Sequence, residues 1–163
     1  MDRLILLRHG KAEAGAASGR DFDRPLTDRG RRDAVIVAKA LDQAGVRPDL
    51  VLVSPAARAA QTWEAMAEVF PHARAEPAPA LYEITSDAIL ALARGEGGDA
   101  RTVMIVGHNP GLGQLAAWLS QDAPPSEGRL RIVEGFPTAA AAVIGFAPAA
   151  FDLYTPRGLG GGT

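Results

Sequence analysis

The chain has 163 residues, a formal net charge of −2 at pH 7 and no cysteine. The absence of cysteine excludes disulfide bonds, thiolate metal sites and cysteine nucleophiles. Its acidic and basic residues are interspersed, so the chain has neither the basic patch of a nucleic-acid-binding protein nor the polybasic segment of a membrane-surface protein.

In chain order, short apolar runs alternate with segments of helical periodicity. The apolar runs predict buried parallel strands at residues 3–7, 50–53 and 102–106. Helical spacing of apolar residues predicts helices at residues 28–44, 55–70, 86–94 and 110–119. Residues 138–146 are rich in alanine, and Val143 with Ile144 favours a late strand there. The alternation predicts an α/β fold, a three-layer α/β/α sandwich around a mainly parallel sheet.

Capping residues mark the expected ends of these helices. We expect Thr27, Ser54 and Asn109 to cap the N-termini of the first, second and fourth helices. Gly45 and Gly95 are expected to end the first and third helices, because glycine readily adopts the left-handed conformation that follows a helix.

The remaining segments predict loops within a single domain. Residues 12–24 and 121–128 are expected to be surface loops. One domain is expected over residues 1–155, followed by a glycine-rich, disordered tail at residues 156–163. The first apolar run is too short for a signal peptide, and no segment has the length of a transmembrane helix. We therefore expect a cytoplasmic protein with no membrane partner.

Two of the three histidines stand directly after predicted strands. Arg8-His9-Gly10 follows the first apolar run, and Gly107-His108-Asn109-Pro110 follows the run at residues 102–106. Ligands of open α/β sheets bind at the carboxyl ends of the strands. This repeated placement predicts that both imidazoles belong to a binding or catalytic site.

Arg58 lies in the first turn of the predicted helix that follows the second strand. A cation there opposes the helix dipole, which is understandable if an anion binds nearby. The guanidinium groups of Arg8 and Arg58 match the oxygens of a phosphoryl group, and one histidine could accept that group on nitrogen. No acidic residues cluster near either histidine in a metal-ligand pattern, so we expect no metal.

Three motifs in this order resemble the histidine phosphatase superfamily: Arg8-His9-Gly10, Ser54-x-x-x-Arg58-x-x-Gln61-Thr62 and Gly107-His108-Asn109-Pro110. The opening from Leu6 to Glu13, the stretch Arg24-Pro25-Leu26-Thr27-x-x-Gly30 and the short length resemble its SixA-type phosphohistidine phosphatase branch. The resemblance covers roughly residues 1–147. It implies an α/β/α sandwich and catalysis without a metal or other cofactor. It also implies that His9 is the phosphorylated nucleophile and that Arg8, Arg58 and His108 form the phosphate pocket.

Glu83 stands where larger members of this superfamily often carry a proton donor. It is equally compatible with a surface carboxylate that precedes a helix, and the sequence does not decide between the two. Should Glu83 not be the acid, Asp21 and Glu13 are the other candidates.

The short chain leaves little room for substrate-selecting insertions, so we expect a shallow, open pocket. Such a pocket suits a phosphorylated side chain presented by another protein. An imidazole leaving group, with a pKa of about 6.5, needs little help from an acid, whereas an alkyl alcohol needs a placed proton donor. The leading hypothesis is a phosphatase acting on phosphohistidine in a protein. The alternatives are a broad small-molecule phosphomonoesterase and, less favoured, a non-catalytic phosphate-binding module. The sequence does not indicate an oligomeric state.

Overall fold

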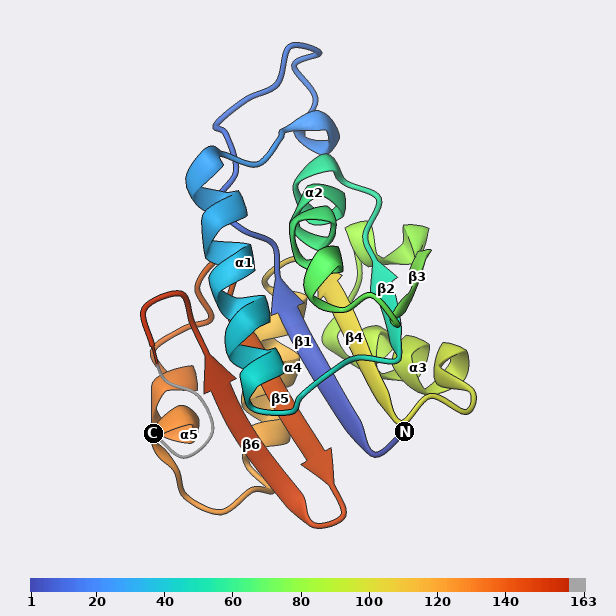
Figure 1. Ribbon diagram of the computed structural model, residues 1–163, viewed down its shortest axis with the longest axis vertical. Helices are drawn as coiled ribbons and strands as arrows, with labels where there is room; N and C mark the ends of the chain where they lie inside the picture. Colours follow the sequence, from blue (N-terminus) through green and yellow to red (C-terminus); the bar gives the residue numbers. More distant parts are fainter. Residues whose placement is uncertain (159–163) are drawn as a thin grey trace.

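A six-stranded sheet carries helices on both faces in the computed structural model, which describes residues 1–158 (Figure 1). The strands are β1 (Arg3–Arg8), β2 (Leu50–Val53), β3 (Arg74–Pro77), β4 (Thr102–Gly107), β5 (Ala141–Phe146) and β6 (Ala149–Tyr154). Their order is β3-β2-β4-β1-β5-β6. The strands from β3 to β1 are parallel, while β5 runs antiparallel to both β1 and β6. The predicted α/β/α sandwich is confirmed, with a mixed sheet.

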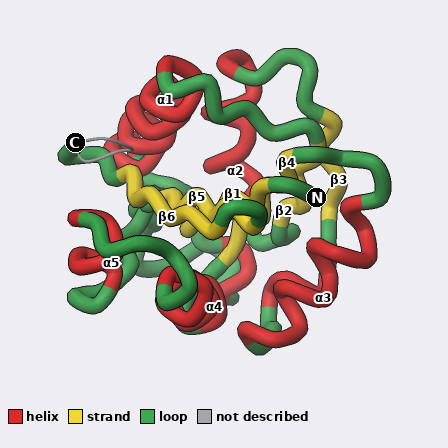
Figure 2. The backbone as a smooth tube through the Cα atoms, turned by 90° about the horizontal axis from the view of Figure 1, so that it is seen from below, coloured by secondary structure: helices red, strands yellow, loops and turns green. Residues whose placement is uncertain are grey.

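The helices form the two outer layers (Figure 2). Helices α1 (Asp28–Gln43) and α2 (Ala57–Met66) cover one face, and α3 (Ser86–Gly97), α4 (Gly111–Ser120) and α5 (Glu127–Ile132) cover the other. Three short 3₁₀ helices, η1 (Asp21–Asp23), η2 (Ala67–Val69) and η3 (Pro79–Tyr82), lie in the connections. In residues 1–158, no helix is long and apolar enough to cross a bilayer.

The position of strand β1 in the fold explains why its sequence is continuously apolar. Leu4 and Leu6 belong to the hydrophobic core under α3 and α4, whereas Ile5 and Leu7 belong to the core under α1 and α2. All four side chains are fully buried, because both faces of this central strand are covered. The same alternation continues through Arg8, the last residue of the strand, to His9. These two side chains therefore point to opposite sides of the sheet edge.

Of the five predicted helix ends, two hold and three differ. Thr27 caps α1 by accepting a hydrogen bond from the Gly30 N–H at 2.9 Å, and Gly45 has the expected positive φ of 74°. Ser54 does not cap α2, which begins at Ala57 behind Ala56. Asn109 is not the N-cap of α4, because Pro110 occupies the cap position. The third helix continues through Gly95 and ends before Gly98, whose φ is 53°. A glycine inside a helix lowers its stability but does not terminate it.

Three elements lack a clear signal in the sequence. Strand β3 is a short, mostly exposed edge strand without an apolar run. Helix α5 has only six residues and overlaps the predicted loop at residues 121–128. Strand β6 is the third such element. It pairs as a hairpin with β5, which confirms the late strand that the sequence predicts.

The predicted disordered tail falls partly outside the described residues. Residues 156–157 form a turn, and the backbones of Thr155 and Gly158 exchange hydrogen bonds of 3.2 Å across it. This part of the tail is therefore ordered, because its backbone groups pair with each other. Residues 159–163 lie outside the part of the chain that the structure describes.

Candidate active site

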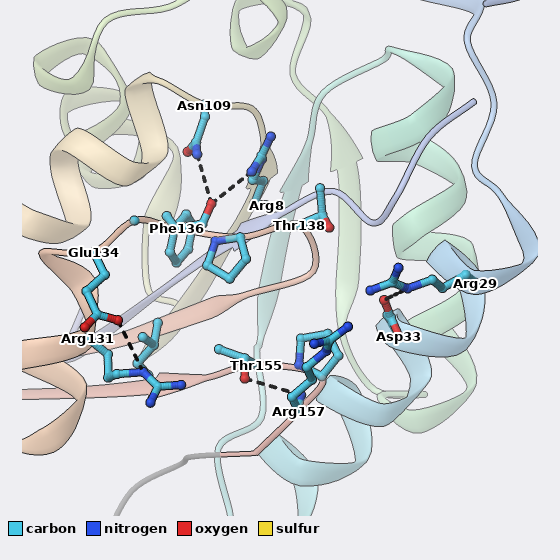
Figure 3. A pocket seen from close by; sticks show the side chains of 14 residues that line it. Arg8, Arg29, Asp33, Asn109, Arg131, Glu134, Phe136, Thr138, Thr155 and Arg157 are labelled. Carbon is cyan, nitrogen blue, oxygen red and sulfur yellow. Dashed lines mark hydrogen bonds and ion pairs between the residues drawn. The ribbon is translucent and has the colours of Figure 1, made fainter. Parts of the chain in front are cut away.

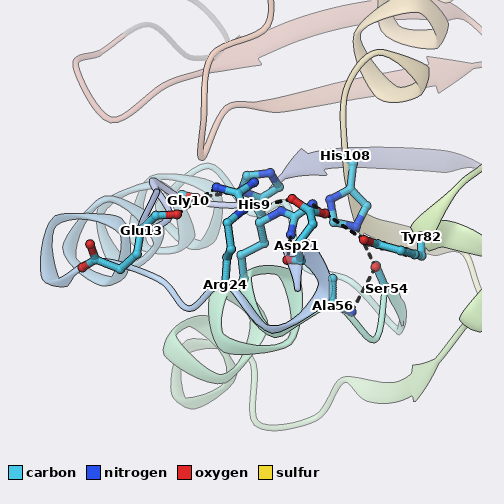
Figure 4. Close-up of polar contacts among 10 residues, drawn as sticks. His9, Gly10, Glu13, Asp21, Arg24, Ser54, Ala56, Tyr82 and His108 are labelled. Atoms are coloured by element: carbon cyan, nitrogen blue, oxygen red, sulfur yellow. Dashed lines mark hydrogen bonds and ion pairs between the residues drawn. The ribbon is translucent and has the colours of Figure 1, made fainter. Parts of the chain in front are cut away.

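The pairing of neighbouring strands places both candidate histidines at one edge of the sheet. Arg8 of β1 pairs with Gly107 of β4, so His9 and His108 follow their strands at the same level. Their ring centroids lie 5.3 Å apart (Figure 4). Ser54 follows the next strand, β2, and its N–H donates to the Val106 carbonyl at 3.0 Å. Three adjacent strands thus deliver three polar side chains to the carboxyl edge of the sheet.

His9 is held as a neutral imidazole with a defined tautomer. Its side chain is buried, and Nδ1 lies 2.7 Å from the Gly10 carbonyl oxygen. A carbonyl oxygen only accepts, so we assign the proton to Nδ1, which leaves the lone pair on Nε2. Burial, together with the charges of Arg58, Arg8 and Arg24, lowers the pKa of His9 to about 4, against the effect of the Gly10 hydrogen bond. Near pH 7, Nε2 is therefore available as a nucleophile.

Gly10 allows the chain to turn closely past the start of α1. A Cβ at this position would lie 2.7 Å from the Gly30 carbonyl oxygen, a distance that real Cβ atoms do not adopt. The Gly10 N–H donates to the Thr62 hydroxyl at 3.0 Å, and that hydroxyl donates to the Arg58 carbonyl at 2.6 Å. Thr62 therefore links the turn after His9 to the helix that carries Arg58.

His108 is oriented by the buried hydroxyl of Ser54. Ser54 Oγ lies 2.7 Å from His108 Nε2 and also accepts from the Ala56 N–H at 3.3 Å. The Ser54 hydroxyl proton has Nε2 as its partner, so we assign the His108 proton to Nδ1. Burial, followed by the charge of Arg58, lowers the pKa of His108 to about 3. This contact also explains why Ser54 does not cap α2: its oxygen faces His108 across the sheet edge.

Arg58 is a buried cation that bonds to the loop after β1. Its Nη1 donates to the Asp21 carbonyl at 2.9 Å and its Nη2 donates to Asp21 Oδ2 at 3.0 Å. The Tyr82 hydroxyl donates to the same carboxylate oxygen at 2.7 Å, and the Tyr82 ring meets the His108 ring edge-on. The Tyr82, Arg24 and Arg58 hydrogen bonds lower the pKa of Asp21 to about 2, so this carboxylate is ionised near pH 7.

Arg8 lies on the opposite side of the edge from α2. Its Nη1 donates to the Phe136 carbonyl at 3.0 Å, and Asn109 Nδ2 donates to the same oxygen at 3.0 Å. Asn109 Oδ1 also accepts from the Gly113 N–H at 3.0 Å, so this side chain supports the start of α4, which begins at Gly111. Burial lowers the pKa of the Arg8 guanidinium below its ordinary value.

Unpartnered buried polar atoms gather in this site. Within residues 1–158, the buried side-chain nitrogen and oxygen atoms that have no hydrogen-bond partner are Arg8 Nε, Arg58 Nε and His108 Nδ1. With the tautomer assigned above, all three are donors. A buried donor without a partner costs about 1–3 kcal/mol. An oxyanion with several acceptor oxygens is the chemical group that such donors suit.

The structure brings Arg8, His9, Arg58 and His108 together but leaves Glu83 apart. Glu83 is exposed just after η3, and its carboxylate makes no hydrogen bond or ion pair with any described residue. The Glu13 side chain is likewise exposed. No group of three histidine, aspartate or glutamate side chains in residues 1–158 could hold a metal ion.

The main residue that sequence reasoning missed is Tyr82. It lies beside Glu83, on a short 3₁₀ helix with no periodic signal, and it reaches His108 only through the tertiary fold. Asp21 was named from the sequence only as a fallback acid, whereas the structure places it against Arg58 as an ionised partner.

We expect both site imidazoles to stay neutral well below pH 6.5. The folded-state pKa values of His9 and His108, about 4 and about 3, lie below the unfolded value, so the unfolded chain takes up protons first. The free energy of unfolding should therefore decrease as the pH falls from about 6.5 towards 4. Imidazole ¹⁵N NMR spectra, assigned with His9→Gln and His108→Gln, test this expectation, and protonation of either ring near pH 6.5 would contradict it.

We expect the Asp21→Asn variant to bind inorganic phosphate about two- to fivefold more tightly, because the substitution removes an exposed negative charge that lies beside the Arg58 cation. Asparagine keeps an oxygen acceptor for Arg58 and removes the charge that repels an incoming anion. Isothermal titration calorimetry measures the affinity. Asp23→Asn is the matched control, because Asp23 lies on the same 3₁₀ helix but pairs with the exposed Arg20 at 2.9 Å. Weaker phosphate binding by Asp21→Asn would show that the carboxylate mainly holds Arg58 in place.

Comparisons with known proteins agree with this geometry. The model of the histidine phosphatase superfamily (branch 1) matches residues 4–89. An uncharacterized chloroplastic protein of Arabidopsis thaliana is 38% identical over 128 residues, which make up 72% of this chain and 59% of the plant protein. The crystal structure of a proposed phosphohistidine phosphatase, SixA, from Agrobacterium tumefaciens has a TM-score of 0.78 and 34% identity, covering 88% of this chain and 91% of that one. The protein histidine phosphatase SixA complexed with tungstate has a TM-score of 0.75 and 28% identity, covering 95% and 97% of the two chains. The chain belongs to the histidine phosphatase superfamily, in its SixA-type branch.

Proposed function

We propose that this chain is a phosphatase that removes the phosphoryl group from phosphohistidine on a protein, through a covalent intermediate on His9 and without a metal. The observation that carries the proposal is the neutral His9 Nε2 beside donors that lack partners. A nucleophile with a free lone pair, next to several buried donors, suits the transfer of a group that carries negatively charged oxygens.

The first chemical step transfers the phosphoryl group to the protein. The lone pair of His9 Nε2 attacks phosphorus, and the bond from phosphorus to the substrate nitrogen breaks. The substrate ring, protonated on its other nitrogen, leaves as a neutral imidazole that keeps this electron pair. Arg8, Arg58 and the His108 Nδ1–H stabilise the charge on the three equatorial oxygens during the transfer.

The second step returns the protein to its starting state. Water attacks the phosphorus of phosphorylated His9, the bond from phosphorus to Nε2 breaks, and inorganic phosphate leaves with the water oxygen. His9 Nε2 regains its lone pair. The hydrogen bond from Nδ1 to the Gly10 carbonyl, 2.7 Å long, keeps the ring in one orientation through both steps.

The scarcity of proton donors supports phosphohistidine as the substrate. The carboxylate that bonds to Arg58, Asp21, is ionised near pH 7, and Glu83 is exposed and unbonded among the described residues. An alkyl alcohol, with a pKa nearer the ~15.7 of water, leaves slowly without an acid. Imidazole, with a pKa of about 6.5, leaves with little help. The similarity to a protein histidine phosphatase, SixA, supports a phosphorylated protein as the substrate class, and we propose a role in signalling for this chain.

We expect turnover to leave the phosphoryl group transiently on His9. Rapid mixing with a ³²P-labelled phosphohistidine protein, followed by quenching in base, should trap a label that is stable in base and released by acid. His9→Gln should trap none. His72→Gln is the control, because His72 is an exposed turn residue outside the site. Undiminished labelling and turnover in His9→Gln would refute the assignment of the nucleophile.

We expect Glu83→Gln to change phosphohistidine hydrolysis little, because imidazole leaves with little help from an acid. If Glu83 is the acid for poorer leaving groups, the variant should slow any alkyl phosphate turnover by about 10²- to 10⁴-fold. Comparing kcat/KM for a phosphohistidine protein, an aryl phosphate and a sugar phosphate measures both effects. An equal loss on all three substrates would instead give Glu83 a positioning role.

The same panel, run with the unmodified protein, tests the function itself. Turnover of sugar phosphates that exceeds turnover of phosphohistidine would favour the small-molecule phosphomonoesterase. Phosphate binding without turnover of any substrate would favour the binding module. Either result would overturn the proposed function.

A further inference from the structure

A pocket of about 610 Å³ opens beside Arg8 (Figure 3). We call it the arginine pocket. Besides Arg8, Asn109 and Leu153, its walls come from three parts of the chain that are distant in sequence: the first turns of α1, the segment from α5 to Thr138, and the turn after β6. Of its lining residues, only Arg8 takes part in the mechanistic steps above.

The arginine pocket carries an excess of positive charge in a chain whose net charge is −2. Its charged lining residues are Arg8, Arg29, Arg131, Arg157, Asp33 and Glu134. Four cations therefore face two carboxylates. Such local charge attracts anionic groups from solution.

The pairs within the arginine pocket are loose. Arg29 Nε lies 3.5 Å from Asp33 Oδ2, and Arg131 Nε lies 3.9 Å from Glu134 Oε2. A charge-assisted hydrogen bond between nitrogen and oxygen measures about 2.7–2.9 Å, so both pairs are longer than a formed bond. Within residues 1–158, the Arg157 side chain has no ion pair. These guanidinium groups can therefore accept another anion at little cost.

The pocket joins the candidate active site through two residues. Arg8 immediately precedes His9, and Asn109 immediately follows His108. Both side chains donate to the Phe136 carbonyl, which belongs to the pocket wall. The charge of Arg8 also contributes to the lowered pKa values of His9 and His108, which places its guanidinium within electrostatic reach of both rings.

We propose that the arginine pocket binds acidic side chains of the protein whose phosphohistidine is presented to His9. This inference rests on the proposed function and names a feature of its substrate. The arginine fork binds carboxylates in two-point contacts. Its four cations come from four chain segments around a volume that suits a stretch of peptide, and a single small anion would reach only part of them. The partner is therefore expected to carry aspartate or glutamate near its phosphohistidine.

The test compares two freshly phosphorylated peptides, one with glutamates flanking the phosphohistidine and one with glutamines in their place. The double variant Arg131→Gln/Arg157→Gln should lower kcat/KM for the acidic peptide about tenfold, mainly by raising KM, because the charges act on encounter and binding. It should leave the glutamine peptide and a small aryl phosphate unchanged. Arg74→Gln is the matched control, since Arg74 is exposed on β3 at the far edge of the sheet.

An equal loss on both peptides, or no loss on either, would overturn the assignment of the pocket. A second measurement separates this result from failure of the proposed function. Fluorescence anisotropy of the unphosphorylated acidic peptide follows binding without any turnover. Weaker binding to the double variant than to the unmodified protein supports the arginine pocket even if no phosphohistidine is hydrolysed. Equal binding to the two proteins refutes it.

Discussion

The parallel pairing of β1 with β4 is the constraint on which the site depends. It sets Arg8 against Gly107, and so it sets the two imidazoles that follow side by side. A shift of one residue in this register would exchange the faces to which Leu4, Ile5, Leu6 and Leu7 point and would disrupt the close packing of both cores. Because Leu4 to Leu7 are fully buried on both faces, the hydrophobic core resists that shift. The packing that stabilises the sheet thus also fixes the spacing between His9 and His108.

The second constraint is electrostatic. Two arginines beside the buried His9 and the partly buried His108 would repel strongly if every group carried a charge. The site avoids this because burial keeps both histidines neutral, while Asp21 offsets the charge of Arg58. The guanidinium groups stay charged at all ordinary pH values. This combination of neutral imidazoles and charged guanidinium groups is chemically useful, because a nucleophilic nitrogen must be unprotonated whereas a phosphoryl group needs fixed positive charge.

The central sheet and the clustering of the motif residues could be predicted from the sequence for a physical reason. The carboxyl ends of buried parallel strands meet at one edge, and continuous apolar runs mark such strands clearly. The runs before His9 and His108 and the run before Ser54 were therefore informative on their own. Strand order was not encoded locally, and it is what places β4 between β1 and β2.

The rest could not be predicted because it depends on tertiary contacts. Strand β3 is a largely exposed edge with little apolar pattern, and α5 is too short for periodicity to show. Tyr82 and Asp21 meet across 61 positions of sequence, through two short 3₁₀ helices. The role of Ser54 changed for a similar reason. Its local sequence favours a helix cap, but His108 on the neighbouring strand takes the hydroxyl in the folded chain.

Among the described residues, the site around His9 holds no carboxylic acid placed to donate a proton. This absence affects how a protein of this size can select its substrates. An enzyme that supplies an acid can cleave many esters, so it needs a shaped pocket to exclude unwanted ones. A site that supplies little acid already discriminates chemically, because only good leaving groups depart at useful rates. Under the proposed function, selection among phosphorylated proteins would rest on charge outside the reacting centre, where Arg29, Arg131 and Arg157 lie. Such contacts act mainly on encounter and orientation, and they require no insertion to close over the substrate.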